Sequence, residues 1–231
     1  MRVNSWRAAC GAAVPLLAAT TMAAHAGGHF EVDDAGTLNA GECQAELWAS
    51  HGQKSDVNLY HVGPSCGVGV VELGLNWDQT RGIRTNTLGP QVKWTFFGRE
   101  AEAPLSAALS GGTQYDLRNN GAWGGQALLA VSWQALSSVQ VNGNLGADWA
   151  TISGERTGRG GLQVQWAVLP VFTLIAERNK SFSQWGSRLG FSWQLLPQTS
   201  IDFSVARLGL FGGETVYTVG LNQVFDFGGK R

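Results

Sequence analysis

The sequence predicts an all-β fold: a closed antiparallel transmembrane β-barrel of about 12 strands, with short periplasmic turns and longer extracellular loops. Apolar and polar residues alternate along most of the chain after residue 40, as in strands that turn one face toward lipid. Tryptophan recurs three residues before a sharp turn, at Trp133, Trp166 and Trp193. Only 14% of the residues are charged, against roughly 25% in soluble domains.

The start of the chain predicts a secretory signal peptide over residues 1–26. Arg2 and Arg7 supply its positive end, residues 8–19 are apolar, and residues 24–26 match the small-x-small cleavage pattern. Beyond this segment no run approaches the ~18 apolar residues of a membrane helix. A mature chain that enters a membrane must therefore do so as a closed barrel, because an open sheet edge leaves backbone groups unpaired in lipid. We expect it in the bacterial outer membrane.

Three further segments follow the signal peptide. Residues 27–40 lack sustained alternation, so we expect a short periplasmic lead-in before a barrel of residues 41–227 and a C-terminal tail of residues 228–231. The lead-in carries the acidic pair Asp33 and Asp34. Two interpretations of this pair stay open, a solvated turn and a cation site.

Each predicted strand is a run of alternating residues. In chain order the runs cover residues 43–49, 57–60, 71–78, 91–96, 105–109, 127–133, 139–151, 162–166, 172–176, 185–193, 201–205 and 217–227. The run 139–151 is the clearest, with Leu145 on its apolar face and Asn144 on its polar face. The run 57–60 is the weakest, and we expect it to end at Gly63-Pro64. An even number of strands returns both chain ends to one side.

The connections between the runs fall into two classes. Short ones, at residues 137–138, Pro170 and Pro197, alternate with longer ones. The longer connections hold Arg81, Arg84, Arg118, Arg156, Arg159, Arg178 and Lys180. A soluble β-sandwich has no reason to alternate long and short loops, so the pattern favours a membrane barrel. The basic residues could bind lipopolysaccharide phosphates or be ordinary solvated charges.

Aromatic residues gather at one end of the predicted strands. We expect an aromatic girdle on the periplasmic side, formed by Trp94, Trp133, Trp166 and Trp193. The last strand carries Phe225 and Phe227 near its end. A terminal aromatic of this kind resembles the signal that the outer-membrane insertion machinery recognises, which makes that machinery an expected partner.

Two cysteines remain after the predicted signal peptide, Cys43 and Cys66. An even pair in an exported chain predicts a disulfide. A metal site on the two cysteines lacks His or Cys partners at ligand spacing, so we expect no metal and no cofactor.

The polar phase of the strands predicts the residues that face the barrel interior, or lumen. The candidates are Glu46, Glu72, Asn76, Lys93, Gln126, Asn142, Asn144, Asp148, Gln163, Gln165, Glu177, Arg188, Asp202 and Asn222. A lumen rich in amides and acids predicts a water-filled channel through which small neutral or cationic solutes diffuse. The alternative is a structural or lipopolysaccharide-interacting barrel without conductance, in which these groups bond one another.

We do not expect an enzyme, although some barrels of this size resemble outer-membrane lipid hydrolases. Such a site needs a nucleophile within hydrogen-bond reach of a base. His51 lies next to Ser50, but successive strand residues point to opposite faces. His61 belongs to the weakest run, and no catalytic sequence motif is present. The net charge of −1 argues against a nucleic-acid partner.

Residues 32–46, VDDAGTLNAGECQAE, resemble the start of the family named "MetA-pathway of phenol degradation", which are outer-membrane transporters. In that family an Asp-Asp-x-Gly-Thr segment precedes a Gly and a Gln-x-Glu first strand, matched here by residues 33–37, Gly41 and residues 44–46. The resemblance implies passage of small, often aromatic, compounds across the outer membrane. It carries no established functional residue.

Overall fold

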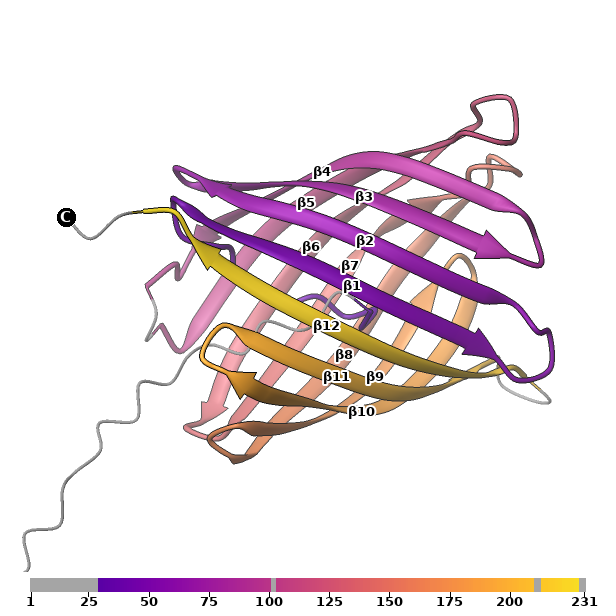
Figure 1. Cartoon of the computed structure of the whole chain (residues 1–231). Helices are drawn as coiled ribbons and strands as arrows, with labels where there is room; N and C mark the ends of the chain where they lie inside the picture. Colours follow the sequence, from indigo (N-terminus) through magenta and orange to yellow (C-terminus); the bar gives the residue numbers. More distant parts are fainter. Residues whose placement is uncertain (1–28, 101–102, 210–212, 229–231) are drawn as a thin grey trace, which may run out of the picture.

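The computed structural model describes residues 29–100, 103–209 and 213–228, in which twelve strands form one closed barrel (Figure 1). The strands are β1 (Glu42–Gly52), β2 (Asn58–Val68), β3 (Val71–Arg81), β4 (Thr85–Phe97), β5 (Leu105–Asp116), β6 (Trp123–Leu136), β7 (Val139–Trp149), β8 (Arg156–Leu169), β9 (Phe172–Ser181), β10 (Gln184–Leu196), β11 (Thr199–Leu208) and β12 (Thr215–Asp226). Each strand pairs antiparallel with its sequence neighbours, and β1 pairs with β12 to close the sheet. The predicted fold class and strand number are confirmed. The expected signal peptide lies outside the described residues.

The inward and outward faces of the wall differ as the alternation predicts. Along β7, Leu145 is 70% exposed on the outside, whereas Asn142 and Asn144 are buried toward the lumen. Large apolar side chains cover the outer surface, since lipid is the solvent there. Within the described ranges no helix is long and apolar enough to cross a membrane.

Substitution Leu145→Arg is expected to impair assembly of the barrel into bilayers. An arginine near the middle of the lipid face costs ~2–4 kcal/mol, because lipid chains do not solvate its charge. Asn144→Arg, one residue away and facing the lumen, should insert normally. The folded fraction of each variant in lipid vesicles, followed by the heat-dependent shift in gel mobility, measures this. Equal insertion of both variants would contradict the assignment of the two faces.

The two ends of the barrel carry different connections. One end, called the turn end here, has turns 69–70, 137–138, 170–171 and 197–198, and it also holds the start of β1 and the end of β12. The other, the loop end, has connections 53–57, 82–84, 117–122, 150–155, 182–183 and 209–214. Two connections break the expected classes. Residues 98–104 make a long connection at the turn end, and residues 182–183 make a tight turn at the loop end.

The turn 182–183 has a local explanation. Phe182 and Ser183 both adopt positive φ, 45° and 64°. Positive φ at both central residues is the type I′ pattern, whose twist matches that of the flanking strands. This turn lets β9 and β10 extend beyond the predicted runs, so Arg178 and Lys180 lie on β9 and not in a loop.

Several strands extend beyond the ends that the sequence predicts. Strand β2 continues through Pro64, which opposes Ala45 of β1. The ladder between β2 and β3 skips residues 63 and 64, so the missing N–H of proline interrupts only one side of the strand. Arg81 ends β3, while Arg156 and Arg159 lie on β8, so that only Arg84 and Arg118 of the basic residues predicted in loops lie in connections.

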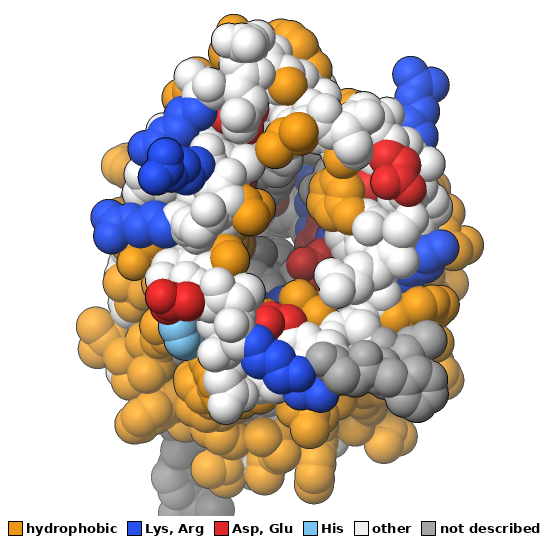
Figure 2. Space-filling model, turned by 90° about the vertical axis from the view of Figure 1, so that its right-hand side faces the viewer, with side chains coloured by type: hydrophobic (Ala, Val, Ile, Leu, Met, Phe, Trp, Pro, Cys, Tyr) orange, Lys and Arg blue, Asp and Glu red, His pale blue; other side chains and the backbone are white. Residues whose placement is uncertain are grey.

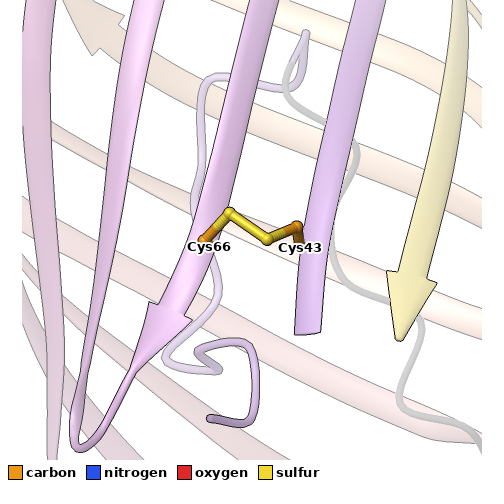
Figure 3. The surroundings of a disulfide bond; sticks show 2 residues. All are labelled: Cys43 and Cys66. Atoms are coloured by element: carbon orange, nitrogen blue, oxygen red, sulfur yellow. A yellow bond between two sulfur atoms is a disulfide. The ribbon is translucent and has the colours of Figure 1, made fainter. Parts of the chain in front are cut away.

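The predicted disulfide is confirmed, and it joins Cys43 of β1 to Cys66 of β2 (Figure 3). The two residues are direct cross-strand partners near the turn end. The covalent bond fixes the register of the strand pair that follows the N-terminal part of the chain.

Candidate functional site: the barrel lumen

The lumen is partly occupied by residues 29–40, here called the N-terminal segment. Figure 1 shows it as an indigo stretch inside the barrel. Its apolar residues Val32, Ala35 and Leu38 are buried. We expected a periplasmic lead-in here, and the described part of residues 27–40 instead lies against the inner wall. The reason is that a polar lumen supplies partners for a backbone that forms no strand.

Side chains of β7, β8 and β9 bind the first part of this backbone. The Glu177 carboxylate accepts hydrogen bonds from the amides of Glu31 and Val32, each at 3.1 Å. Asn144 accepts from the Asp33 amide at 2.7 Å and donates to the Asp33 carbonyl at 2.8 Å. Gln163 Nε2 donates to the Val32 carbonyl at 3.1 Å. These bonds replace the water that a free segment would bind.

The second part of the segment crosses to β6, β4 and β3. The Ala35 amide donates to Ser132 Oγ at 2.8 Å, and the Ala35 carbonyl accepts from Thr95 Oγ1 at 2.6 Å. The Leu38 amide donates to Glu72 Oε2 at 3.0 Å. The segment thus contacts strands on several sides of the lumen before it reaches β1 at the turn end.

Ion pairs fix the acidic residues of the segment. Lys93 Nζ lies 2.9 Å from Asp33 Oδ1 and 3.4 Å from Asp34 Oδ1. Asp34 is buried, so the pair is neither a solvated turn nor an open cation site, the two interpretations left by the sequence. The pair contacts a lysine of the wall, which the strand phase had placed inside.

Two arginines contact the other end of the segment. Arg159 lies 2.9 Å from Glu31 Oε2 and 3.2 Å from Asp148 Oδ1. Arg188 lies 3.3 Å from Glu177 Oε1 and donates to the carbonyl of His29. With Lys93, these are the buried cations of the lumen among the described residues, and each is paired with a carboxylate.

The side of the lumen beside β1 and β3 is more open, although the segment reaches Glu72 there through the Leu38 amide. Inward residues of β7–β9 that contact the segment are buried, whereas Glu46, Glu72, Asn76 and Asp78 of β1 and β3 are partly exposed. Figure 2 looks at the loop end and shows the barrel hollowed there, with acidic and basic side chains inside the opening. The open part of the lumen therefore lies beside β1 and β3.

On this side of the lumen the partly exposed Trp48 of β1 contacts the buried His61 of β2. The Trp48 ring stacks on His61, with ring centroids 4.7 Å apart and planes inclined by 9°. His61 Nδ1 lies 2.7 Å from Asp78 Oδ1. Sequence reasoning missed this group because Trp48 is an apolar residue at one of the alternate positions of β1 that otherwise hold polar residues. The alternation along β1 nevertheless directs its side chain into the lumen. His51 Nδ1 instead contacts Asn58, and Ser50 contacts Thr218.

The remaining lumen candidates contact one another along the wall. Asn142 donates to Gln163, and Gln165 donates to the same Gln163 oxygen. Further bonds join Gln126 to Arg159, Asn76 to Gln91, Gln44 to Glu46, and Asn222 to Asp202. The structure thus brings these predicted polar residues into separate pairs and short networks along the inner wall. The sequence alone did not reveal the contacts of Glu31, Asp33, Ser132, Thr95 and Arg159 inside the lumen.

The tryptophans that open each predicted turn lie on the outer surface. Trp94, Trp133, Trp166 and Trp193 are 46–54% exposed and sit near the turn ends of β4, β6, β8 and β10. An exposed indole at one level on four strands is typical of an aromatic belt at a membrane boundary.

Comparison with solved structures gives several matches to β-barrels. A KdgM porin aligns with TM-score 0.65 and 9% identity, over 79% of this chain and 99% of that chain. A NanC porin aligns with TM-score 0.61 and 12% identity, over 78% and 98%. The COG4313 outer membrane channel from Pseudomonas putida F1 aligns with TM-score 0.56 and 13% identity, over 83% and 98%. At these identities the likeness concerns the fold alone.

Comparisons of the sequence give fewer matches than comparisons of the structure. No curated protein sequence matches the chain. One family model, described as "Uncharacterised conserved protein UCP029691", matches residues 13–207. Since this match covers most of the sequence, the chain belongs to that family.

Proposed function

We propose that the protein is an outer-membrane channel through which small neutral or cationic solutes diffuse beside the N-terminal segment. The observation that carries the proposal is the distribution of charge in the lumen. The side chains of Lys93, Arg159 and Arg188 are only 8–10% exposed, and each is paired with an acid. In two of these pairs the acid is the more exposed member: Glu31, the partner of Arg159, is 36% exposed, and Asp33, the partner of Lys93, is 38% exposed.

Glu46 and Glu72 extend the same acidic surface on β1 and β3. Carboxylates that remain partly hydrated along a narrow path attract cations and repel anions, since the low-dielectric wall strengthens the field. One of the similar structures is a KdgM porin in complex with disordered oligogalacturonate. That ligand is a chain of carboxylates, and the acidic path here opposes such an anion. The shared fold therefore does not transfer this cargo.

The resemblance of residues 32–46 to phenol-pathway transporters adds aromatic compounds as candidate solutes. Trp48 is partly exposed and is held by the buried His61 that stacks on it, so the indole supplies a flat surface against which a planar ring can pack. This support is independent of the charge argument, and it extends the proposal to uncharged aromatic compounds.

The proposed outer-membrane location rests on the apolar outer surface of the barrel and on the predicted signal peptide. For insertion we propose the barrel assembly machinery as partner, because Phe225 and Phe227 are exposed at the end of the last strand. The competing function is a structural barrel without conductance, which the extensive bonding of the N-terminal segment favours. Fatty-acid release from lipopolysaccharide by the purified protein, lost in His51→Ala, would instead support a lipid hydrolase.

Planar-bilayer recording tests the channel. We expect discrete conductance steps and a reversal potential that favours K⁺ over Cl⁻. The double variant Glu46→Gln, Glu72→Gln should lower the cation-to-anion permeability ratio roughly two- to threefold, because it removes two carboxylates from the path. The side-chain amide oxygen introduced by Glu72→Gln can still accept the hydrogen bond from the Leu38 amide, so docking of the segment is preserved.

Glu100→Gln is the matched control, since Glu100 is exposed in the connection 98–104 outside the lumen. It should leave the permeability ratio unchanged. Absence of any conductance would support the structural barrel, and equal effects of both changes would refute the acidic path. Liposome swelling with neutral sugars, organic cations and aromatic acids then ranks the solutes.

A further inference from the structure

A groove of about 830 Å³ runs over the outer face of β6–β9. Its sides are formed by Leu129, Val131, Leu145 and Leu162, all on the outward phase of their strands. The volume is within the range of small-molecule sites, which is roughly 300–1,000 Å³. On a wall that faces lipid, such a groove offers an apolar chain more contact than a smooth surface does.

Glycines make the floor of this groove. Gly160 and Gly158 of β8 lie opposite Leu145 and Ala147 of β7. A Cβ added to Gly158 would meet nothing within 4 Å, so the space above it is open. Glycine inside a strand weakens the strand and marks places where another group approaches the backbone closely. Two such glycines on the outward phase of one strand therefore point to an occupant.

The groove has a cationic end. Arg178 and Lys180 of β9 line it, and both face outward. Arg178 donates to Ser187 Oγ at 2.7 Å, and its guanidinium lies 5.0 Å from the Trp185 ring centroid. Lys180 lies opposite Gly160 of the groove floor. Neither cation has a carboxylate within ion-pair distance among the residues that the structure describes.

The combination of an apolar groove with a cationic end matches one kind of ligand, an acyl chain that ends in a phosphorylated head group. Arg and Lys bind phosphate oxygens through charge-assisted hydrogen bonds, and a tryptophan beside them suits the headgroup level. The cations lie within a few residues of the turn 182–183, at the loop end. Longer loops mark the extracellular end of such barrels.

We propose that this groove binds lipopolysaccharide, with one acyl chain along β7 and β8 and a lipid A phosphate between Arg178 and Lys180. The choice of lipopolysaccharide rests on the proposed outer-membrane location, in which this end meets the outer leaflet. It does not rest on conductance. Binding would also satisfy two charges that otherwise lie on the lipid-facing side of the wall.

Thermal unfolding of the purified full chain in detergent, titrated with lipopolysaccharide, tests the site. The unfolding midpoint should rise with lipopolysaccharide for the wild type. For Arg178→Gln, Lys180→Gln the apparent affinity should fall at least ~10-fold, because both phosphate contacts are lost. Arg207→Gln is the matched control: Arg207 of β11 is exposed, and it donates to the Thr215 hydroxyl at 2.9 Å as Arg178 does to Ser187. This control should bind as the wild type does.

Gly158→Leu tests the groove itself, since a Cβ at this position meets no atom within 4 Å and the rest of the side chain would occupy the groove. It should weaken lipopolysaccharide binding while the midpoint of the lipid-free protein stays the same. An equal response to phosphatidylglycerol vesicles, or unchanged binding in the charge variant and in Gly158→Leu, would overturn the proposal. Bilayer conductance recorded on the same variants should not change, so failure of the channel proposal is distinguished from failure of this one.

Discussion

Deletion of residues 29–38 is expected to raise the single-channel conductance roughly two- to threefold, because the deletion widens the narrowest part of the path. The N-terminal segment holds buried Val32, Ala35 and Leu38 within the lumen. Conductance follows the cross-section that water can fill, and the polar wall left behind can be hydrated. The barrel should still assemble, since the deletion removes no strand residue and all the strand pairs of the closed sheet remain.

A second variant distinguishes the effect of filling the lumen from the effect of shortening the chain. Replacement of residues 29–38 by a glycine-serine stretch of equal length keeps the chain but removes the side chains and the ordered contacts. Its conductance should lie between those of the wild type and the deletion, with larger current noise. If the deletion conducts like the wild type, then the segment does not occupy the conducting path, and the acidic route beside it is wrong.

The wall of the barrel was predictable from the sequence, because its cause is local. Lipid outside and water or polar groups inside impose a period of two on each strand. That period determined the strand number and the phase of residues such as Leu145 and Asn144. It could not determine the strand ends, since Pro64 and Arg159 look like loop residues and yet lie within β2 and β8.

The N-terminal segment was not predictable for the opposite reason. Its partners are distant in the chain: Asn144 lies 111 residues from Asp33, and Ser132 lies 97 residues from Ala35. A segment without regular structure leaves no period, and its acidic residues look solvated until the lysine that binds them is known. The one local trace is the spacing of three between Val32, Ala35 and Leu38, the residues that the structure buries.

The exposure of residues on the open side of the lumen was not predictable either, because it depends on contacts between distant parts of the chain. Strand parity gives the direction in which Glu46, Glu72 and Trp48 point, but not whether water reaches them. Exposure depends on where the N-terminal segment packs. The segment covers inward residues of β7–β9, contacts β3 through Glu72, and leaves the inward residues of β1 and β3 partly exposed. The proposed preference for cations therefore depends on the inward residues of β1 and β3 and on the N-terminal segment together.

Substitution Lys93→Met is expected to release the N-terminal segment. It leaves Asp33 and the buried Asp34 without the cation that lies 2.9 Å and 3.4 Å from their oxygens. Removal of one partner of a buried ion pair costs ~3–5 kcal/mol. Here the cost arises mainly at the buried Asp34, whose carboxylate loses the lysine that offsets its charge. This free-energy cost destabilises the docked state of the segment. The barrel itself is unaffected, since the backbone pairing of β4 does not depend on the Lys93 side chain.

Hydrogen exchange of the backbone amides measures the release. The amides of Val32 and Ala35, bound to Glu177 and Ser132 in the wild type, should exchange ~100-fold faster or more in Lys93→Met. Amides within the β6–β7 ladder should be unaffected. The triple variant Lys93→Met, Asp33→Asn, Asp34→Asn removes both acids as well and should restore most of the protection. Without such rescue, the loss in Lys93→Met would have to come from packing, and the ion pairs would not be what holds the segment in the lumen.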